Sequence, residues 1–464
     1  MNIFFYLIGI AYALIGLFKP KLATQIFIAF SIFQLGWLDR YVIVGAELGR
    51  ISLIFGIILM FRIVLDLISK RKRILKTHRF LKPLIPLGLI YLLITLLSNY
   101  YNNESIILGL YSLRYYIIGY TACLSLYFYN RSSLSIIRLK RLLIILGLIQ
   151  IPFSIVKYIH AGGGALQTLD SVTGTFSGYG ELVGCQLLCV GILIYDKLKY
   201  SKNTLKINNY LLSLVLISPL ILSKSRTASA LIAIIPLFAF FLYAIHSKDI
   251  VKNLGKAIFI IALSLVIWIL FYNYFWLVGY DVEEQLSSEY IYGYFMREAE
   301  YSPTRTVYGA GLGRMMAIIK ATDTVTQNPF NLLFGFGSGS TQEAIFLRQS
   351  GNYYEEYGEF AGIGRNQYSR IIFEYGFVGL MALMAFLLHI KRSISRAFRG
   401  TIRKILNDTF AIYLFVLIVM SWYSVTFSSN FFSILLGGFI AVFQAEQDHI
   451  LTKKSKENIR LQNV

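Results

Sequence analysis

The sequence predicts an all-α integral membrane protein, a bundle of about 12–13 transmembrane helices with one large extracytoplasmic loop that contains short helices. Hydrophobic residues make up 56% of the 464 residues and charged residues only 15%, whereas soluble domains carry about a quarter charged residues. Apolar runs long enough to span a bilayer recur along the chain, and short clusters of basic residues lie between them. These features together exclude a soluble globular domain.

The apolar runs give the expected elements in order. A bilayer core of about 30 Å needs roughly 20 apolar residues per helix. The first run lacks a basic leader and a small-residue cleavage site, so we expect it to be retained as a membrane segment. The first two runs are short, which leaves open whether both span. The candidate spans are 2–18, 22–38, 45–68, 83–98, 105–129, 142–158, 182–195, 209–223, 227–245, 257–278, 367–390, 408–424 and 428–444.

The basic residues set the expected orientation. Six clusters hold 28 of the 44 basic residues, and from the third helix onward they fall on alternate loops, as a single multi-pass topology requires. Basic residues collect on the cytoplasmic side of membrane proteins, so these loops account for the net charge of +20 and no nucleic-acid partner is expected. The clusters lie at 70–82, 131–141, 197–206, 248–256, 391–404 and 453–460.

Four regions follow from this topology. Residues 1–279 are expected to form an N-terminal transmembrane helix bundle, 280–365 the large extracytoplasmic loop, 366–445 the C-terminal transmembrane helices and 446–464 a basic cytoplasmic tail. The loop holds 11 of the chain's 24 acidic residues but only six basic ones. Ordered loops of this length are usually functional. Within it, the stretch 315–321 is expected to be helical.

Arginines at the outer face need a reason, because exported loops are depleted of positive charge. Arg226 lies beside Lys224 and Ser225 in a short turn before a helix, and such a cationic, hydroxyl-rich turn suits a phosphate or pyrophosphate. A snorkelling anchor with a serine cap explains the same residues. Arg365 precedes another helix, where the macrodipole disfavours a cation, and this conflict favours an anionic ligand.

Three further arginines are weaker candidates for substrate binding. Arg305 and Arg314 lie in a glycine-rich stretch where the backbone could approach a ligand closely, although a flexible loop is the alternative. Arg114 lies ten residues into a membrane segment, so we expect it to face the bundle interior or a water-filled cavity. A structural pair with an acidic residue is the competing explanation.

Among the acids, Glu181 stands at the outer end of a helix. It could serve as a general base, or it could simply stabilise the helix dipole from the first turn. Only His160 of the five histidines is expected on the outer side, and the three cysteines lie in or beside apolar segments. We therefore expect neither a metal site nor a disulfide framework.

Three motifs carry a resemblance to a known family. Residues 223–230 contain a Ser-Arg turn among small residues, 328–339 contain Pro, an apolar run and Gly-Phe-Gly, and 364–380 contain Arg-Asn-Gln-Tyr followed by Glu-Tyr-Gly-Phe-Val-Gly. In order and spacing they resemble the family of O-antigen ligases and O-antigen or capsular polysaccharide polymerases. A weaker fourth match is Thr-Gly-Thr-Phe at 173–176.

The resemblance implies a helical bundle in the bacterial cytoplasmic (inner) membrane, with a cavity capped by the large loop. It implies glycan transfer from undecaprenyl diphosphate without a nucleotide sugar, metal or other cofactor, and Asn366 and Tyr368 match the substrate-binding motif. The partners would be an undecaprenyl-diphosphate-linked oligosaccharide and membrane lipids, and a chain-length regulator protein is a candidate. Where ligases carry His, this chain has Arg365, which favours a polymerase.

The predicted function is therefore that of a polysaccharide polymerase, a glycosyltransferase that joins lipid-linked repeat units by inverting transfer at the outer face of the membrane. Arg226 and Arg365 would hold the diphosphate and Glu181 would be the base. An O-antigen ligase, which transfers glycan to lipid A core, differs only in the acceptor. A transporter or flippase of a lipid-linked or anionic solute is the alternative from another class.

Overall fold

The computed structural model is almost entirely helical in the part that it describes. These residues are 2–33, 49–69, 79–160, 172–176, 178–200, 207–222, 226–245, 312–344, 347–357, 362–426 and 429–462, with single positions at 262, 292 and 296. The described part contains one small sheet, in which β1 (Glu343–Ala344) pairs antiparallel with β2 (Gln349–Ser350). The fold class of the described part is therefore all-α, as predicted.

Five of the described helices are long and apolar enough to cross a membrane, and a bent pair of helices makes a sixth. Shorter apolar helices accompany them at Leu7–Phe18, Pro20–Ile32, Leu211–Leu222 and Ile234–Ile245. The described part therefore supports an all-α membrane protein. The count of 12–13 spans stays a prediction, because the run at 257–278 lies almost wholly outside the described residues.

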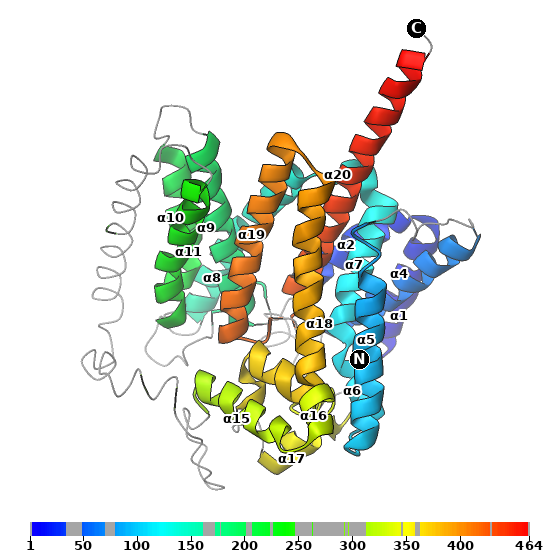
Figure 1. The fold of residues 1–464 in the computed structure, drawn as a ribbon, viewed down its shortest axis with the longest axis vertical. Coiled ribbons are helices and arrows are strands. Elements are labelled where there is room, and N and C mark those ends of the chain that lie inside the picture. Colours follow the sequence, from blue (N-terminus) through cyan, green and yellow to red (C-terminus); the bar gives the residue numbers. More distant parts are fainter. Residues whose placement is uncertain are drawn as a thin grey trace.

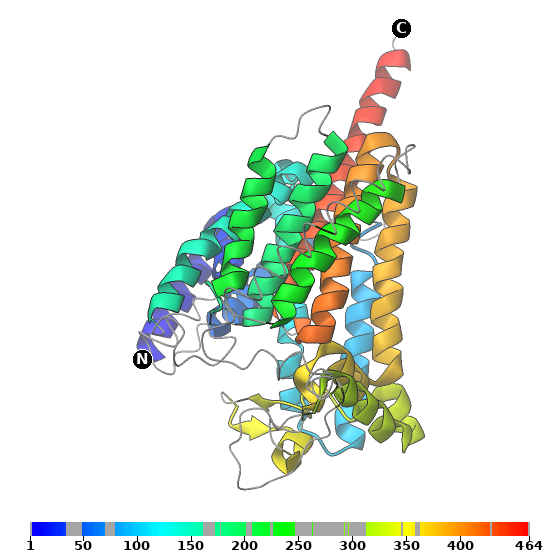
Figure 2. The same cartoon turned by 90° about the vertical axis from the view of Figure 1, so that its left-hand side faces the viewer.

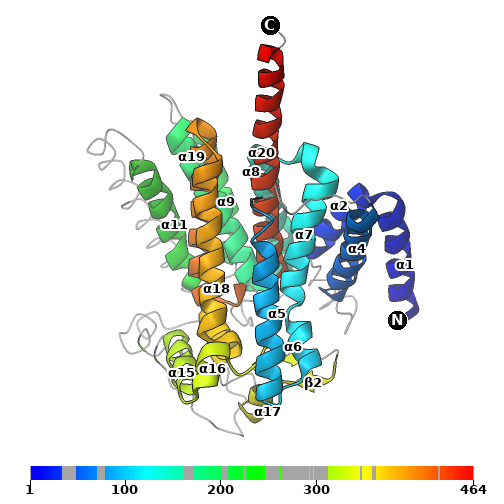
Figure 3. The same ribbon diagram turned by 45° about the vertical axis from the view of Figure 1, so that its right-hand side comes forward.

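The N-terminal helices form a core of their own. Helices α2 (Pro20–Ile32) and α4 (Gly49–Ser69) pack against one side of α7 (Arg114–Asn130), and α1 (Asn2–Phe18) packs on α2 and α4, farther from α7 (Figure 3). In this core the ring of Tyr12 stacks on that of Phe55 at 3.7 Å. The Tyr12 hydroxyl donates to the carbonyl of Ala23, which ties α1 to α2.

The main bundle surrounds α9 (Tyr179–Tyr200). Helices α8 (Ile136–His160), α10 (Ile207–Leu222), α11 (Arg226–Ile245) and α19 (Gly400–Tyr423) pack against it. This arrangement explains why residues 181–195 of α9 are buried. The bundle is completed by α5 (Leu84–Tyr101), α18 (Gln367–Ala397) and α20 (Asn430–Gln462).

The two ends of the bundle differ in character. The end that we name the cap end carries α15 (Arg314–Thr326), α16 (Pro329–Phe334), α17 (Asn352–Tyr357) and the β1–β2 pair, drawn in yellow-green at the bottom of Figures 1 and 2. The C-terminal part of α20 projects from the opposite end. The helix predicted within the large loop at 315–321 is confirmed as part of α15.

At the end opposite the cap, which we name the basic end, ion pairs join the helix termini. Lys140 at the start of α8 lies 2.7 Å from Asp196 near the end of α9. Lys199 pairs with Asp408 of α19 at 2.9 Å, and Arg131 pairs with Asp448 of α20 at 3.0 Å. Basic clusters that are far apart in the sequence thus gather at one end of the bundle, as the loop pattern predicts.

Two predicted elements differ from the observed ones. The run 105–129, expected as one helix, is broken into α6 (Ile106–Ser112) and α7 with a bend of 41°. The Ser112 hydroxyl donates to the carbonyl of Gly109, and the Leu113 N–H bonds to Leu110, a tight 3₁₀-type turn that ends the first segment. In addition, α20 continues as helix through 462, into the region expected as a tail after 445.

Candidate functional site at the cap end

Helix α18 is broken at Gly376, between two and three turns after its first residue, Gln367. Gly376 has φ 61° and ψ −169°, which no residue within a helix adopts. A Cβ atom at this position would lie 2.4 Å from the carbonyl oxygen of Leu333, so the end of α16 passes directly against the break. The Phe373 carbonyl beside the break accepts a hydrogen bond from the N–H of Phe336 at 2.7 Å. The break therefore seats the cap on α18.

The loop after α16 is also fixed to α5. Asn99 holds Ser338 with two bonds, since its amide donates to the Ser338 carbonyl at 3.1 Å and its carbonyl accepts from the Ser338 N–H at 2.9 Å. The Ser98 hydroxyl donates to the carbonyl of Gly335. Both α5 side chains are fully buried. Polar residues in this predicted membrane span are thus explained by the cap that they bind.

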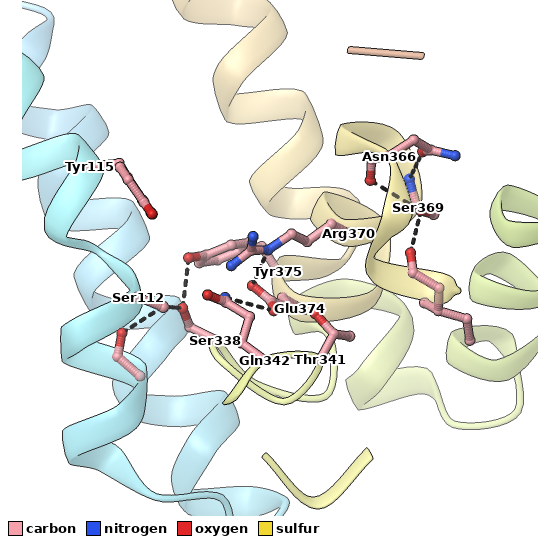
Figure 4. Close-up of polar contacts among 12 residues, drawn as sticks. Ser112, Tyr115, Ser338, Thr341, Gln342, Asn366, Ser369, Arg370, Glu374 and Tyr375 are labelled. Carbon is pink, nitrogen blue, oxygen red and sulfur yellow. Dashed lines mark hydrogen bonds and ion pairs between the residues drawn. The ribbon is translucent and has the colours of Figure 1, made fainter. Parts of the chain in front are cut away.

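The second turn of α18 carries a buried ion pair. Arg370 Nε lies 3.2 Å from Glu374 Oε2, and the two side chains are 8% and 0% exposed. Glu374 Oε1 accepts from the Thr341 hydroxyl at 2.6 Å and from the Gln342 amide at 3.2 Å, as Figure 4 shows. Three donors from two segments therefore neutralise and orient this carboxylate. Charged groups inside a membrane helix are functional candidates by default.

The Arg370 guanidinium keeps donors for a ligand. Within the described residues its only hydrogen-bond acceptor is Glu374, which takes Nε and leaves the terminal nitrogens without an acceptor. The terminal nitrogens are also not fully buried, so part of their surface is accessible to a molecule the size of water. In Figure 4 the side chain points toward the helix that carries Tyr115. The geometry suits a group that accepts hydrogen bonds at the cap end.

Hydroxyl groups join three segments beside this pair. Ser338 Oγ and Tyr375 Oη lie 2.6 Å apart, and Ser338 Oγ also bonds to Ser112 of α6 (Figure 4). The Tyr91 hydroxyl of α5 donates to the Gly379 carbonyl at 2.8 Å, just after the break in α18. The cap loop, the bent α6–α7 pair and the broken α18 are therefore held as one unit.

Four predicted site residues surround the start of α18 and the turn between α19 and α20. Glu181, in the first turn of α9, is buried, and its carboxylate accepts from the Ser429 hydroxyl and from the Gly178 N–H. Arg314 donates to the Tyr423 carbonyl, and its guanidinium lies 4.4 Å from the centre of the Tyr423 ring. The structure thus brings a predicted base and a predicted cation to the same turn.

Asn366 and Tyr368 have structural contacts at this place. Asn366 is the N-cap of α18, accepting from the Ser369 N–H at 2.8 Å and donating to the Arg314 carbonyl at 2.9 Å. The Tyr368 hydroxyl donates to the Ile418 carbonyl at 3.0 Å. These contacts position α15, α18 and α19, so the two residues act through the placement of their neighbours in this structure.

Arg114 is held by aromatic side chains. It lies at the bend between α6 and α7, half-buried between the rings of Tyr111 and Tyr115, at 4.1 and 4.3 Å from their centres. Its guanidinium donates to the Tyr111 carbonyl and the Tyr115 hydroxyl. Among the described residues no carboxylate pairs with it, and two aromatic faces take the place that the competing explanation gave to an acidic residue. The broken helix explains its place, because the bend puts it near a helix end.

The remaining predicted residues are described in part or not at all. Lys224, Ser225 and Arg305 lie outside the described residues. For Arg226 and Arg365 the structure gives the backbone, with Arg226 as the first residue of α11 and Arg365 as the last of the 3₁₀ turn η3 (Ile363–Arg365). Arg365 therefore directly precedes the cap residue of α18, as the sequence predicts.

Two charged residues that carry much of the site, Arg370 and Glu374, were missed as site residues by the sequence interpretation. Both lie within the motif 364–380, four residues apart in an otherwise apolar helix. This spacing places them on one helix face. The rule that singled out Arg114, a charge inside a membrane segment, would have found them.

Glu104 faces the same cap from the loop between α5 and α6, outside the candidate spans. Its carboxylate accepts from the N–H of Asn352 at 3.1 and 3.3 Å. Burial raises the pKa of Glu104 to about 7, with smaller contributions from the carboxylates of Glu374 and Glu355, while the Asn352 N–H opposes the shift. This pKa lies above the ordinary value of 4.5, so the carboxyl group is harder to ionise in the folded protein than in the unfolded one. The free energy of unfolding should therefore decrease as pH rises through this range.

We expect the melting temperature of the purified protein to fall between pH 5 and pH 8 more steeply in the wild type than in Glu104→Gln, because the amide cannot ionise. Differential scanning fluorimetry in detergent measures this. The control is Glu356→Gln, which removes an exposed carboxylate from α17, the helix that also carries Asn352. This variant should keep the wild-type slope. Equal slopes in all three proteins would rule out Glu104 as the titrating group.

No protein-family model and no curated protein matches this chain. The class of protein is therefore defined by the structure, as an all-α protein with candidate membrane-spanning helices and a buried charged cluster under a helical cap. Within the described residues, no three His, Cys, Asp or Glu side chains gather as a metal-binding group.

Proposed function

We propose that this protein is a polysaccharide polymerase of the bacterial cytoplasmic membrane, which joins undecaprenyl-diphosphate-linked repeat units at the outer face. The observation that carries the proposal is the Arg370–Glu374 pair, buried in a broken candidate span beneath the cap. It lies on the same helical turns as Asn366 and Tyr368, which match the glycosyltransferase motif. The motif resemblance supplies the reaction, and the buried charges give the site its chemistry.

The proposed topology has 12–13 spans, with the basic end in the cytoplasm and the cap end outside. Its support is the gathering of Lys140, Lys199 and Arg131 at one end of the bundle, while the cap occupies the other. Lipid-linked repeat units are presented at the outer leaflet in this family, so the site and its substrate would share a face.

The reaction breaks the bond between the anomeric carbon of the donor glycan and its diphosphate. A hydroxyl of the acceptor glycan attacks that carbon from the opposite face, which inverts its configuration, and undecaprenyl diphosphate leaves. Negative charge develops on the diphosphate, and guanidinium groups in a low-dielectric site stabilise it as they would any oxyanion. Arg226 and Arg365 would hold the diphosphate, and Arg370 offers further donors to the substrate.

The acceptor proton needs a destination. Glu181 is the candidate base, since its buried carboxylate lies at the cap end and is oriented by Ser429. Glu374 is poorly suited to this task because proton uptake would neutralise its buried ion pair with Arg370. We assign Glu374 the role of a positioning residue for Arg370.

One observation favours a second candidate, a transporter of an anionic or lipid-linked solute. Secondary transporters place substrate sites at broken membrane helices, and α18 is broken at Gly376 beside buried charges. In this protein the break lies near the cap end of α18. An enzyme that works on the outer leaflet is expected to have its site at that end, so the position of the break favours the polymerase. An O-antigen ligase remains separated from the polymerase only by its acceptor.

The test is reconstitution of the purified protein with lipid-linked repeat units. The wild type should give a ladder of glycan sizes on a gel, and Arg226→Ala, Arg365→Ala and Arg370→Ala should each lower the rate at least about 100-fold, as loss of an oxyanion donor does. Arg396→Ala, an exposed arginine at the basic end of α18, is the matched control and should retain activity.

Other outcomes assign the alternatives. Single transfer that requires added lipid A core, without a ladder, would make the protein a ligase. The proposal would be overturned, and the protein assigned as a transporter, if labelled lipid-linked units moved across the membrane of sealed vesicles and no glycosidic bond formed under any condition.

A further inference from the structure

A pocket opens at the basic end, away from the candidate site. The turn between α1 and α2 and the last residues of α7 line a shallow, open pocket of about 510 Å³. The α7 side of the pocket ends two residues before Arg131, whose ion pair with Asp448 marks the basic end. The residues that define its chemistry are Lys19, Lys21, Leu22, Gln25, Phe128 and Tyr129.

The pocket is positively charged. Lys19 and Lys21 are both exposed, and neither ammonium group has a hydrogen-bond or ion-pair partner in the described part of the chain. Asp66, which accepts from the hydroxyl of the pocket residue Tyr129 at 2.9 Å, pairs with Arg62 at 3.2 Å. The charge of the two lysines is therefore available for a ligand.

The same pocket continues into an apolar surface. Leu22 and Phe128 line it, and α1 beside it exposes a row of large apolar side chains, of which Phe18 is 80% exposed. In a membrane-spanning bundle this surface faces lipid. A ligand for the whole pocket therefore needs an anionic group and a hydrocarbon part, a combination that a phospholipid provides.

We propose that this pocket binds an anionic phospholipid of the leaflet at the basic end, with its phosphate between Lys19 and Lys21 and its acyl chains along Leu22 and Phe128. Basic pockets between membrane helices on the cytoplasmic side are suited to anionic headgroups. The proposal rests on the topology above, but it does not depend on glycosyl transfer.

The position of the pocket gives the lipid a structural consequence. Helices α1, α2 and α4 have their own hydrophobic core, which meets the bundle mainly through α7. A lipid that contacts the α1–α2 turn and the end of α7 at once bridges these two parts. Bound lipid therefore stabilises the attachment of the N-terminal helices.

Native mass spectrometry of the full-length protein, titrated with phosphatidylglycerol, tests the proposal. The wild type should retain phosphatidylglycerol in preference to phosphatidylcholine. Lys19→Gln with Lys21→Gln should weaken that binding by about 30-fold, as expected for the loss of two lysines near an anionic lipid surface. The matched control, Arg403→Gln with Lys404→Gln, removes the same charge from exposed positions at the basic end and should bind as the wild type does.

Three results would overturn the proposal. Equal losses in both double variants would show attraction to net charge alone, and equal retention of phosphatidylcholine would exclude headgroup recognition. Retention of inorganic phosphate alone, at the level seen for phosphatidylglycerol, would show a site for a free anion. Size-exclusion chromatography verifies that each variant is folded, and the result is independent of whether the protein makes polysaccharide.

Discussion

Replacing Glu374 by alanine should destabilise the protein by about 3–5 kcal/mol, the usual cost of removing one partner from a buried ion pair. The change leaves the 8%-exposed Arg370 side chain without its carboxylate. It also removes the acceptor for the half-buried Thr341 and Gln342 side chains, and donors that lose their partner add to the cost. Chemical or thermal unfolding of the purified protein in detergent measures the loss.

A second pair of substitutions separates stability from activity. Arg370→Leu combined with Glu374→Leu removes both charges, so it should cost much less stability than Glu374→Ala alone, because an apolar pair of similar size avoids the unpaired charge. The double variant should nevertheless be inactive, since it lacks the guanidinium donors that Arg370 offers to the substrate. If Glu374→Ala were as stable as a variant of the exposed Glu356, the pair would have no structural role and this account of the site would be wrong.

Replacing Gly376 by alanine should unseat the cap. A side chain at φ 61° and ψ −169°, a region almost confined to glycine, costs about 1–3 kcal/mol by itself. The added methyl group would also meet the Leu333 carbonyl at 2.4 Å, and relieving such overlap typically costs a further 1–3 kcal/mol or so. We expect both a lower melting temperature and a loss of activity, because the bond from Phe336 to Phe373 depends on this close approach.

Gly400 provides the control for that substitution. Its φ is 62°, but a Cβ atom there would have nothing within 4 Å. Gly400→Ala therefore places a side chain at a similar positive φ without the clash, and activity should survive. Equal effects of the two substitutions would mean that the cap does not press on the break in α18.

Much of the helical framework could be predicted because its signals are local. The start of α18 was predicted near Asn366 and is confirmed, since an N-cap needs only a few neighbouring residues. Glu181 was placed in a first helical turn, and α15 was expected within the large loop, both in agreement with the structure. The gathering of basic residues at one end likewise followed from short stretches of sequence.

The breaks and the cap contacts could not be predicted, because they depend on partners that are distant in sequence. Asn99 bonds Ser338, 239 residues away. Ser112 beside the bend also bonds Ser338, and the Phe373 carbonyl beside the break accepts from Phe336. The apolar residues of the sequence continue through both positions, so the hydrophobicity pattern does not reveal the bend or the break. The matched motif also drew attention to Asn366 and Tyr368, whose polar groups bond within the protein, and away from Arg370.

The central claim, formation of a glycosidic bond, is tested most directly by mass spectrometry of a reaction in detergent, where no sealed compartment exists and transport cannot contribute. Purified protein and lipid-linked repeat units should yield lipid carrying two or more units, with one undecaprenyl diphosphate released for each new bond. The claim would be contradicted if the substrate masses stayed unchanged when folded wild-type protein is present at a concentration comparable to that of the substrate, with or without lipid A core.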